Sequence, residues 1–317
     1  MRLEARLRAF AAFARLRSFS GAAQELLISQ PAVSKHIAGI ERELGTLLIE
    51  RQPRGGTLTP AGEFVANYVL RAEAILAQAA LGVAEFRAPG SGVLTIVASG
   101  TTGTYLVPEV IAAFQQKYPG ARVALELGTS ATAVERLRSH RAEFGVVGGF
   151  VAAPEIEVEP LVEDEIIVVG SPVLAGRRLS REELESLTWI SREKGSATRA
   201  VIEAACADLG ISPKRQLELP SWEAIKRAVQ RGHGIAGCSR FAVEDELRAS
   251  SLTLIPIRRW KVHKTMSIIR VRDAALTPLA EQFLVMLRER WGERHRRVSS
   301  TRKQGRWTAG DRSALRS

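Results

Sequence analysis

The sequence predicts an all-helical N-terminal unit with a hairpin, a long connecting helix, and a larger two-lobed α/β domain. Three observations predict this arrangement. The first ninety residues carry apolar side chains at helical spacing, and beyond residue 92 short β-rich apolar runs alternate with helical stretches. The chain of 317 residues with 45% hydrophobic content is long enough for more than one core. The expected units are 1–62, 63–90, 91–293 and a tail, 294–317.

The N-terminal unit begins with an amphipathic helix and two further helix starts. Ser20 and Ser29 are candidate N-caps of the second and third helices, Pro31 fits the first turn of the third, and Gly45 ends it. The first helix is indicated by apolar residues three and four apart: Leu3, Leu7, Phe10, Ala11 and Ala14.

The stretch from Leu47 to Leu58 contains Pro53, Gly55 and Gly56 and is typical of a hairpin. Helices followed by a hairpin predict a winged helix-turn-helix. A long helix should then run to about Phe86 and end at a hinge, 88–92. Its small side chains favour pairing with a second copy, while packing against its own domain is the alternative.

The second domain shows β-rich apolar runs between helical stretches, which predicts a doubly wound α/β fold with two lobes and a cleft. The tail after Trp291 is basic with little apolar content, so we expect no ordered structure there. The expected strands are Val93–Ala98, Val123–Leu127, Phe144–Val147, Ile166–Val169, Leu217–Leu219, Ile235–Cys238 and Met266–Val271.

Positive charge is concentrated at the two ends of the chain. Residues 1–62 hold nine Lys/Arg and five Asp/Glu, and residues 294–317 hold eight Lys/Arg and one Asp. These two segments account for the whole net charge of +11, so residues 63–293 carry no net charge. Basic ends attract polyanions, which makes nucleic acid the first partner to test and an anionic membrane the second. No targeting segment or long apolar run is present, so a cytoplasmic protein without a membrane partner is expected.

The start of the third helix has the residues that a DNA-reading helix needs. Gln30 can pair with an adenine edge, Pro31 and Ala32 can approach thymine methyl groups, and Ser34 and Lys35 can hold phosphates or bases. Ser20 can meet a phosphate through its hydroxyl and the helix amides. Taken alone, Ser20 and Ser29 are better explained as helix caps and Lys35 as a surface charge, but their joint order favours double-stranded DNA.

These residues resemble the signature of LysR-type transcriptional regulators. The similarity extends from Phe19 to Gly62, and it implies groove contacts for Gln30, Pro31, Ser34 and Lys35, with Arg51 and Arg54 of the wing near phosphates or the minor groove. Ser29, which begins the same run, is also counted among the DNA-binding residues. Ile49 stands where the family usually has phenylalanine, and this difference is expected to affect packing more than DNA contact. Gly55 and Gly56 are expected to loosen the wing tip and so affect the reach of Arg54.

Hydroxyl side chains gather at four expected strand-to-helix transitions in the second domain. Helix starts carry free amides and a positive dipole end, so several of them at one crevice would suit a small carboxylate, sulfate or phosphate. Each alone is a routine N-cap. The residues are Ser99 to Thr102, Thr129 to Thr132, Ser196 to Arg199 and Ser221 to Glu223.

The segments 195–199, 223–229 and 232–236 also resemble the effector-binding domain of the same family. The resemblance implies a small-molecule effector between the lobes, a dimer or tetramer built through the long helix, promoter DNA and RNA polymerase as partners. Arg199 could pair with an effector carboxylate or brace a lobe through a salt bridge. The implied effector-binding residues are Ser99, Thr101, Thr102, Thr129, Ser130, Ser196, Thr198 and Arg199.

Other classes are less well supported. The five histidines are not joined to a nucleophile motif, and no phosphate-binding or dinucleotide fingerprint occurs, so no catalytic residue or cofactor is expected. Cys206 and Cys238 lack metal-ligand spacing, so no metal is expected and both should be small buried hydrophobes. The alternative is a small-anion binding protein with nonspecific affinity for polyanions.

Overall fold

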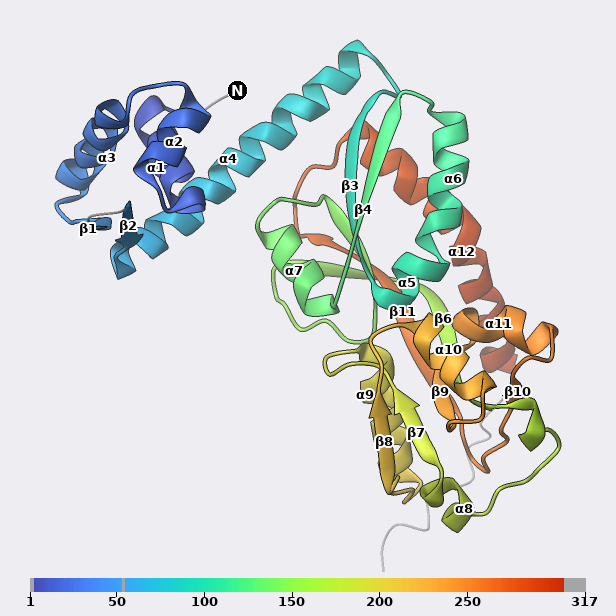
Figure 1. The fold of residues 1–317 in the computed structure, drawn as a ribbon. Coiled ribbons are helices and arrows are strands. Elements are labelled where there is room, and N and C mark those ends of the chain that lie inside the picture. Colours follow the sequence, from blue (N-terminus) through green and yellow to red (C-terminus); the bar gives the residue numbers. More distant parts are fainter. Residues whose placement is uncertain (1–2, 53–54, 305–317) are drawn as a thin grey trace, which may run out of the picture.

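The computed structural model describes residues 3–52 and 55–304, with 293–304 as backbone only. The chain forms an N-terminal unit, a long connecting helix and two lobes that follow one another along the molecule (Figure 1). The N-terminal unit consists of α1 (Ala5–Leu16), α2 (Phe19–Leu26), α3 (Gln30–Leu44) and the antiparallel hairpin strands β1 (Ile49–Gln52) and β2 (Gly55–Leu58).

The N-terminal core confirms the expected helical spacing, because Phe10, Phe13, Val33 and Ile37 are fully buried in one cluster. The helix α3 is capped by Ser29 and ends at Gly45, whose φ of 67° lies in the left-handed region that glycine tolerates.

The expectation that Ser20 caps α2 was wrong. The cap is Ser18, whose Oγ accepts a hydrogen bond of 3.1 Å from the backbone amide of Gly21. Phe19 packs on Phe13 with 4.5 Å between ring centroids, and this contact draws Phe19 into the helix as its first residue. Ser20 is therefore an exposed residue of the first turn.

The connecting helix α4 (Pro60–Arg87) begins after the N-cap Thr59 and leads into the first strand of lobe I. Thr59 Oγ1 accepts a hydrogen bond of 3.0 Å from the Gly62 amide and donates one of 2.7 Å to the Leu47 carbonyl oxygen. The start of α4 is thus tied to the segment before the hairpin.

Lobe I is built on one part of a seven-stranded sheet with the order β10-β6-β11-β5-β3-β4, to which β9 adds by pairing with β6. The strands β3, β4 and β5 are parallel, whereas β11 runs antiparallel to both β5 and β6. The elements of lobe I are β3 (Gly92–Ser99), α5 (Gly100–Tyr105), α6 (Val107–Lys117), β4 (Ala121–Gly128), α7 (Ser130–Arg138), β5 (Phe144–Gly148) and α12 (Pro278–Gln304), with parts of β6 (Ile156–Gly170) and β11 (Val262–Val271).

Lobe II follows β6 and lies at the far end of the molecule from α4 (Figure 1). Its parallel pair β7 and β8 is linked to the segment before β9 by a bridge between Trp189 and Ile235. Its elements are η1 (Pro172–Leu174), α8 (Arg181–Ser186), β7 (Thr188–Ser191), α9 (Ala197–Asp208), β8 (Arg215–Glu218), α10 (Trp222–Gln230), β9 (Ala236–Ser239), α11 (Arg240–Arg248) and β10 (Thr253–Leu254).

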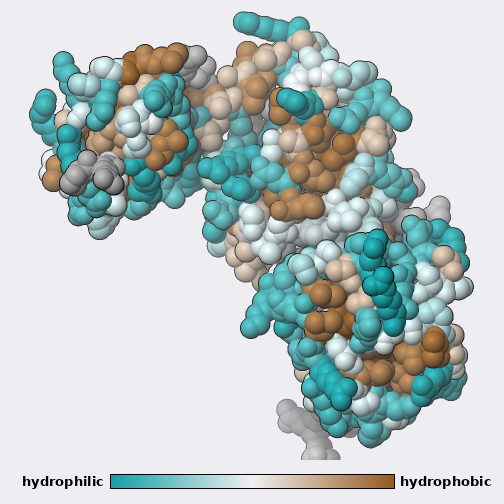
Figure 2. Space-filling view, in the orientation of Figure 1, coloured by the Kyte–Doolittle hydropathy of each residue, from teal (hydrophilic) through white to brown (hydrophobic). Residues whose placement is uncertain are grey.

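Both faces of the lobe I sheet are buried. On β3 the side chains of Leu94 and Ile96 belong to the cluster under α6 and α12, while Val97 points the other way into the cluster under α7. This alternation is the two-residue period of a strand covered on both sides. The brown apolar areas of the two lobes are separated in Figure 2 by a white and teal band.

The fold class is confirmed, but the sheet is not the purely parallel one of a doubly wound fold. The chain passes from lobe I to lobe II along β6 and returns along β11, so these strands must run in opposite directions. Four residues of β6 were expected, whereas fifteen are observed. The ladder between β6 and β11 shifts register between Met266 and Ser267.

The C-terminal tail also differs from expectation. The helix α12 continues through Gln304, so residues 294–304 are helical in backbone. The buried side chains of Phe283, Leu287 and Trp291 anchor the helix, and the sequence from 293 to 304 contains neither glycine nor proline to end it. The rest of the expected tail lies outside the described residues.

Candidate functional site

The first turn of α3 presents the expected DNA-contacting residues to the surface. Ser29, Gln30, Pro31 and Lys35 are exposed, and Ser34 is half-buried. The opposite face of the helix is fixed in the core, so the polar face cannot turn inward. The Ser29 hydroxyl is already used in part, because its Oγ accepts a hydrogen bond of 3.3 Å from the Ala32 amide.

Arg51 of the wing strand β1 lies close to the start of α2. Its guanidinium carbon is 5.4 Å from the centre of the buried Phe19 ring, a cation–π contact that orients the side chain. Ser20 is exposed in the same first turn of α2. Arg54 lies outside the described residues.

The two wing glycines, which were expected to loosen the hairpin, stand at closely packed positions. A Cβ atom on Gly56 would lie 2.8 Å from Ile49 Cγ2 and 2.9 Å from the Glu50 carbonyl oxygen, so a larger residue does not fit. Gly55 has a φ of 136°, which also favours glycine. The hairpin therefore packs closely on itself at Gly56, and at Gly55 it packs against the Arg17 carbonyl oxygen, 3.1 Å from an added Cβ atom.

The second candidate site is a narrow cleft between the two lobes. Its volume is about 20 Å³, which is room for roughly one water molecule. Lobe I contributes Ser99, Gly100, Thr101, Gly128, Thr129 and Ser130; lobe II contributes Arg192, Glu193, Gly195, Ser196, Ala197 and Thr198; and Lys264 comes from β11.

Most of the expected hydroxyls meet at this cleft, each with a local partner. Ser99 Oγ accepts a hydrogen bond of 3.0 Å from the Gly148 amide, and Ser130 Oγ donates one of 3.2 Å to the Gly148 carbonyl oxygen. Thr129 and Ser196 cap α7 and α9. The hydroxyls of both lobes thus surround one space at the ends of these helices.

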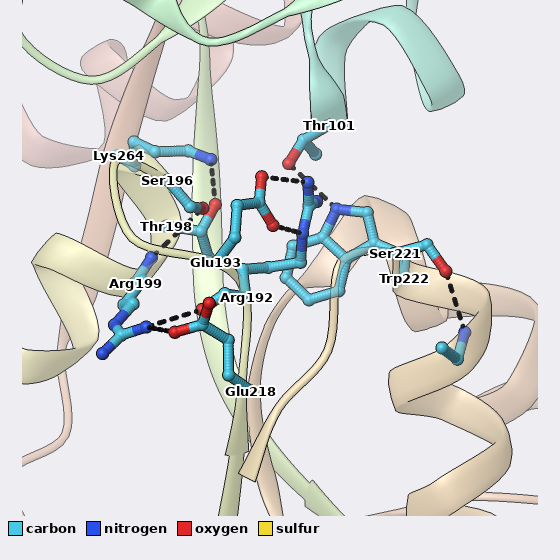
Figure 3. Close-up of polar contacts among 11 residues, drawn as sticks. Thr101, Arg192, Glu193, Ser196, Thr198, Arg199, Glu218, Ser221, Trp222 and Lys264 are labelled. Carbon is cyan, nitrogen blue, oxygen red and sulfur yellow. Dashed lines mark hydrogen bonds and ion pairs between the residues drawn. The ribbon is translucent and has the colours of Figure 1, made fainter.

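Two of the expected threonines are buried. Thr101 Oγ1 accepts a hydrogen bond of 3.3 Å from Trp222 Nε1 across the lobes (Figure 3). Thr102 is fully buried, and its hydroxyl is taken up by the carbonyl oxygens of Ser99 and Val146. Thr102 is not among the residues that line the cleft.

Arg199 adopts the bracing arrangement rather than facing the cleft centre. Its Nε lies 2.7 Å from Glu203 Oε1 and its Nη1 lies 2.5 Å from Glu218 Oε2. The same Nη1 donates a hydrogen bond of 3.1 Å to the Arg192 carbonyl oxygen, which links α9 to β8 and to the end of β7 (Figure 3).

Sequence reasoning missed a buried ion pair at the centre of the cleft. Lys264 Nζ donates a hydrogen bond of 2.7 Å to Thr198 Oγ1 and lies 3.4 Å from Asp164 Oδ2, while Ser239 Oγ donates a hydrogen bond of 2.8 Å to Asp164 Oδ1. Burial lowers the pKa of Lys264 and raises the pKa of Asp164. The pair depends on the register of β6 with β11, which no local pattern reveals.

Sequence reasoning also missed Arg192, which stands at the end of β7. Its guanidinium carbon lies 5.2 Å from the centre of the Trp222 ring, and Glu193 accepts two hydrogen bonds from it, of 2.7 and 2.8 Å. The position of Arg192 three residues before the Gly-Ser-Ala-Thr run was the only signal available.

A wider cavity of about 540 Å³ adjoins the cleft and shares Ser130, Gly195, Ser196 and Ala197 with it. Phe150, whose side chain is 89% exposed, lines this outer space. The narrow cleft therefore opens toward solvent on one side.

Other kinds of site are not found in the described part of the chain. No group of three His, Cys, Asp or Glu side chains could hold a metal ion there, and no helix is long and apolar enough to cross a membrane. Cys206 and Cys238 are buried free thiols, as expected, and burial raises the pKa of Cys206 to about 11.

Two family models match the chain. The model described as "LysR substrate binding domain" matches residues 87–292, and "Bacterial regulatory helix-turn-helix protein, lysR family" matches residues 5–63. The HTH-type transcriptional regulator CysL of Bacillus subtilis (strain 168) is 31% identical over 288 residues, which cover 90% of this chain and 96% of CysL.

Solved structures share the fold. ArgP from Mycobacterium tuberculosis is 18% identical with a TM-score of 0.71, covering 90% of this chain and 96% of ArgP. The regulatory domain of Synechocystis PCC6803 CcmR, in complex with 2-PG, is 24% identical with a TM-score of 0.57, covering 63% of this chain and 97% of that domain.

Proposed function

This chain belongs to the LysR family of transcriptional regulators, and from that premise we propose that it reads promoter DNA with α3 and its wing under the control of a small anionic effector held between the lobes. The observation that carries the DNA-reading part is the exposed polar turn of α3. Gln30 and Lys35 face outward there while the rest of the helix is fixed in the core.

The proposed DNA contacts are divided by role. Gln30 and Pro31 approach base edges, Ser34 and Lys35 hold phosphates or bases, and Ser20 and Arg51 support the phosphates on either side of the groove. Arg54 belongs to the same proposal. Positive charge at both chain ends favours the approach of DNA, and RNA polymerase is a further partner of a promoter-bound regulator.

The proposed effector is an anion that binds hydroxyls and free amides of both lobes. Ser99, Thr101, Thr129, Ser130 and Ser196 support this choice because they surround one cleft. Thr198 takes part through Lys264, and Arg199 is included as a residue that lines the adjoining wider cavity. An effector that binds one lobe arrangement more tightly shifts the position of the paired DNA-binding units. No catalytic role is proposed for the cleft.

We assign one role to each unit of the chain: residues 1–62 bind DNA, residues 63–90 pair with a second copy, and residues 91–293 bind the effector. A basic tail follows from residue 294. One face of α4 supports the pairing, because large apolar side chains separated by about one, two and three turns are exposed along it. They are Phe64, Tyr68, Ile75 and Phe86. A cytoplasmic location follows from work on promoter DNA.

Fluorescence anisotropy tests the proposal with the DNA immediately upstream of the protein's own gene, a scrambled duplex and a salt series. We expect the protein to bind the upstream DNA tightly and in preference to the scrambled duplex. Its DNA affinity should also change when one of a panel of small anions, which includes 2-PG, is added. Equal and steeply salt-dependent binding to both duplexes, with a DNA affinity that no anion changes, would favour the alternative of a small-anion binding protein with nonspecific affinity for polyanions.

A further inference from the structure

Arg192 spans the cleft from lobe II to lobe I. It stands at the end of β7, yet a Cβ atom on Gly100 of lobe I would lie 2.9 Å from its Nη2. The Trp222 ring covers its guanidinium on another side, so only 11% of the side chain is exposed. Arg192 is therefore a largely desolvated cation that touches both lobes (Figure 3).

The hydrogen-bonding edge of Arg192 is already occupied by a carboxylate of the same chain. Glu193 Oε2 accepts a hydrogen bond of 2.7 Å from Arg192 Nε, and Glu193 Oε1 accepts one of 2.8 Å from Nη2. This two-bond arrangement is the one in which arginine holds carboxylate, sulfate and phosphate groups. Burial alone would raise the pKa of Glu193, but the hydrogen bonds from Arg192 and from the Glu193 amide, together with the charges of Arg192 and Arg199, outweigh burial and lower the pKa, so Glu193 is ionised.

The charges of the closed cleft are balanced without any added anion. Lys264 is matched by Asp164, and Arg192 is matched by Glu193. An anion that entered beside these pairs would bring one uncompensated negative charge into a poorly hydrated space, which is costly. The remaining volume of about 20 Å³ is also too small for more than roughly one water molecule.

The carboxylates of Asp164 and Glu193 differ in how easily they can move out of the cleft. Asp164 is fully buried between β6 and β11, whereas the Glu193 side chain is 33% exposed at the start of a turn that contains Gly195. Rotation of Glu193 toward solvent would release the Arg192 edge and restore its own hydration. Glu193 is thus the anion that can be exchanged.

We infer that Glu193 is an internal ligand of the cleft and that the effector is an oxyanion which takes the Arg192 edge from it. Effector binding is then an exchange of one anion for another, and a singly charged oxyanion leaves the charge balance of the cleft unchanged. This inference rests on the proposed effector site. It assigns Arg192 as the anion receptor and Glu193 as the competitor that limits affinity.

Isothermal titration calorimetry of the full chain without DNA tests the exchange, with inorganic sulfate, inorganic phosphate and acetate as probes. Glu193→Gln removes the competing charge, so at least one probe should bind at least about tenfold more tightly than to the unsubstituted protein, which corresponds to about 1.4 kcal/mol. Glu218→Gln is the matched control, because it removes a carboxylate from Arg199, which does not line the narrow cleft, and leaves the pair of Arg192 and Glu193 intact. Its effect should stay below about twofold.

The double variant Arg192→Gln/Glu193→Gln should lose the gain, since the receptor is absent, and circular dichroism checks that each variant is folded. Unchanged affinity in Glu193→Gln, an equal gain in Glu218→Gln, or a gain that survives loss of Arg192 would each overturn the inference. The single Glu193→Gln variant decides the matter if the double variant does not fold. Because the titration contains no DNA, failure of promoter binding remains a separate result that concerns the proposed function.

Discussion

Glu85 of the connecting helix accepts a hydrogen bond from the Leu279 amide in the first turn of α12, with 2.9 Å between Oε2 and the amide nitrogen. Glu143 acts beside it, since its Oε2 accepts a hydrogen bond of 2.8 Å from the Thr277 amide. Two carboxylates therefore satisfy free amides at the start of α12, where a negative charge is favourable. One of them belongs to the helix that leads to the DNA-binding unit.

Glu85→Gln should change how stability depends on pH. Burial raises the pKa of Glu85 above its ordinary value of 4.5, despite the hydrogen bonds from Leu279 and Thr277. A raised pKa disfavours the charged form in the folded state, so the variant should gain stability relative to the unsubstituted protein as pH rises through the folded-state pKa, and the difference should shrink below the ordinary value. Urea unfolding across this range measures it, and a difference independent of pH would contradict the prediction.

Gly62→Ala should disrupt the start of α4. A Cβ atom there would lie 2.0 Å from the Leu48 carbonyl oxygen, so the hairpin and helix must separate, at a cost of about 1–3 kcal/mol or more. Gly292→Ala in α12 is the matched control, because among the residues whose side chains the structure describes no atom outside the adjacent helix backbone lies within 4 Å of its added Cβ, and it should stabilise by about 0.5–1 kcal/mol. Thermal unfolding of both variants tests this, and equal effects would be inconsistent with the packing described.

Gln30→Ala and Lys35→Ala should affect DNA binding differently. Loss of Gln30 should relax base preference by about 1–3 kcal/mol, while loss of Lys35 should weaken all DNA binding and reduce its salt dependence. Anisotropy titrations with specific and scrambled duplexes separate the two. Equal losses on both duplexes for Gln30→Ala would remove its assigned role.

Thr198→Val should destabilise lobe II and the contact between α9 and β11. The Lys264 ammonium would lose its acceptor at 2.7 Å while remaining buried, which costs about 1–3 kcal/mol. Urea unfolding of the full chain measures the loss. An unchanged free energy of unfolding, together with a normal response to anions, would show that the Thr198 hydroxyl is dispensable for both roles.

Ile75→Arg should weaken pairing between two copies of the chain. Its side chain is 45% exposed on the same face of α4 as Phe64 and Phe86, and a charge within that face would have to be desolvated on pairing. Leu81→Arg is the control, since Leu81 is equally exposed on a different side of the helix. Analytical ultracentrifugation should show a lower oligomeric state only for Ile75→Arg, and the same result for both variants would argue against this face.

The parts of the molecule that could be predicted are those with local patterns. The apolar spacing around Val33 and Ile37 predicted α3, and Ser29 with Pro31 marked its start. Hydroxyls at helix starts also pointed to the cleft, because capping is a property of a few neighbouring residues. The Ser18 cap was missed because Ser18 and Ser20 are equivalent by sequence, and only the packing of Phe19 decides between them.

The parts that could not be predicted depend on residues far apart in the chain. Lys264 reaches Asp164 through the register of β6 with β11, and Arg192 reaches Gly100 across the cleft between the lobes. Neither contact leaves a periodic pattern in the sequence. The charged centre of the cleft is therefore a product of tertiary structure, while its rim of hydroxyls is a product of secondary structure.

The register shift between Met266 and Ser267 lies inside the lobe I sheet, because both residues are also paired with β5, opposite Gly148 and Val147. It stands two residues from Lys264, which faces the cleft, and a bulge locally increases strand twist. The extra twist therefore sets the direction in which β6 and β11 leave the lobe I sheet toward lobe II.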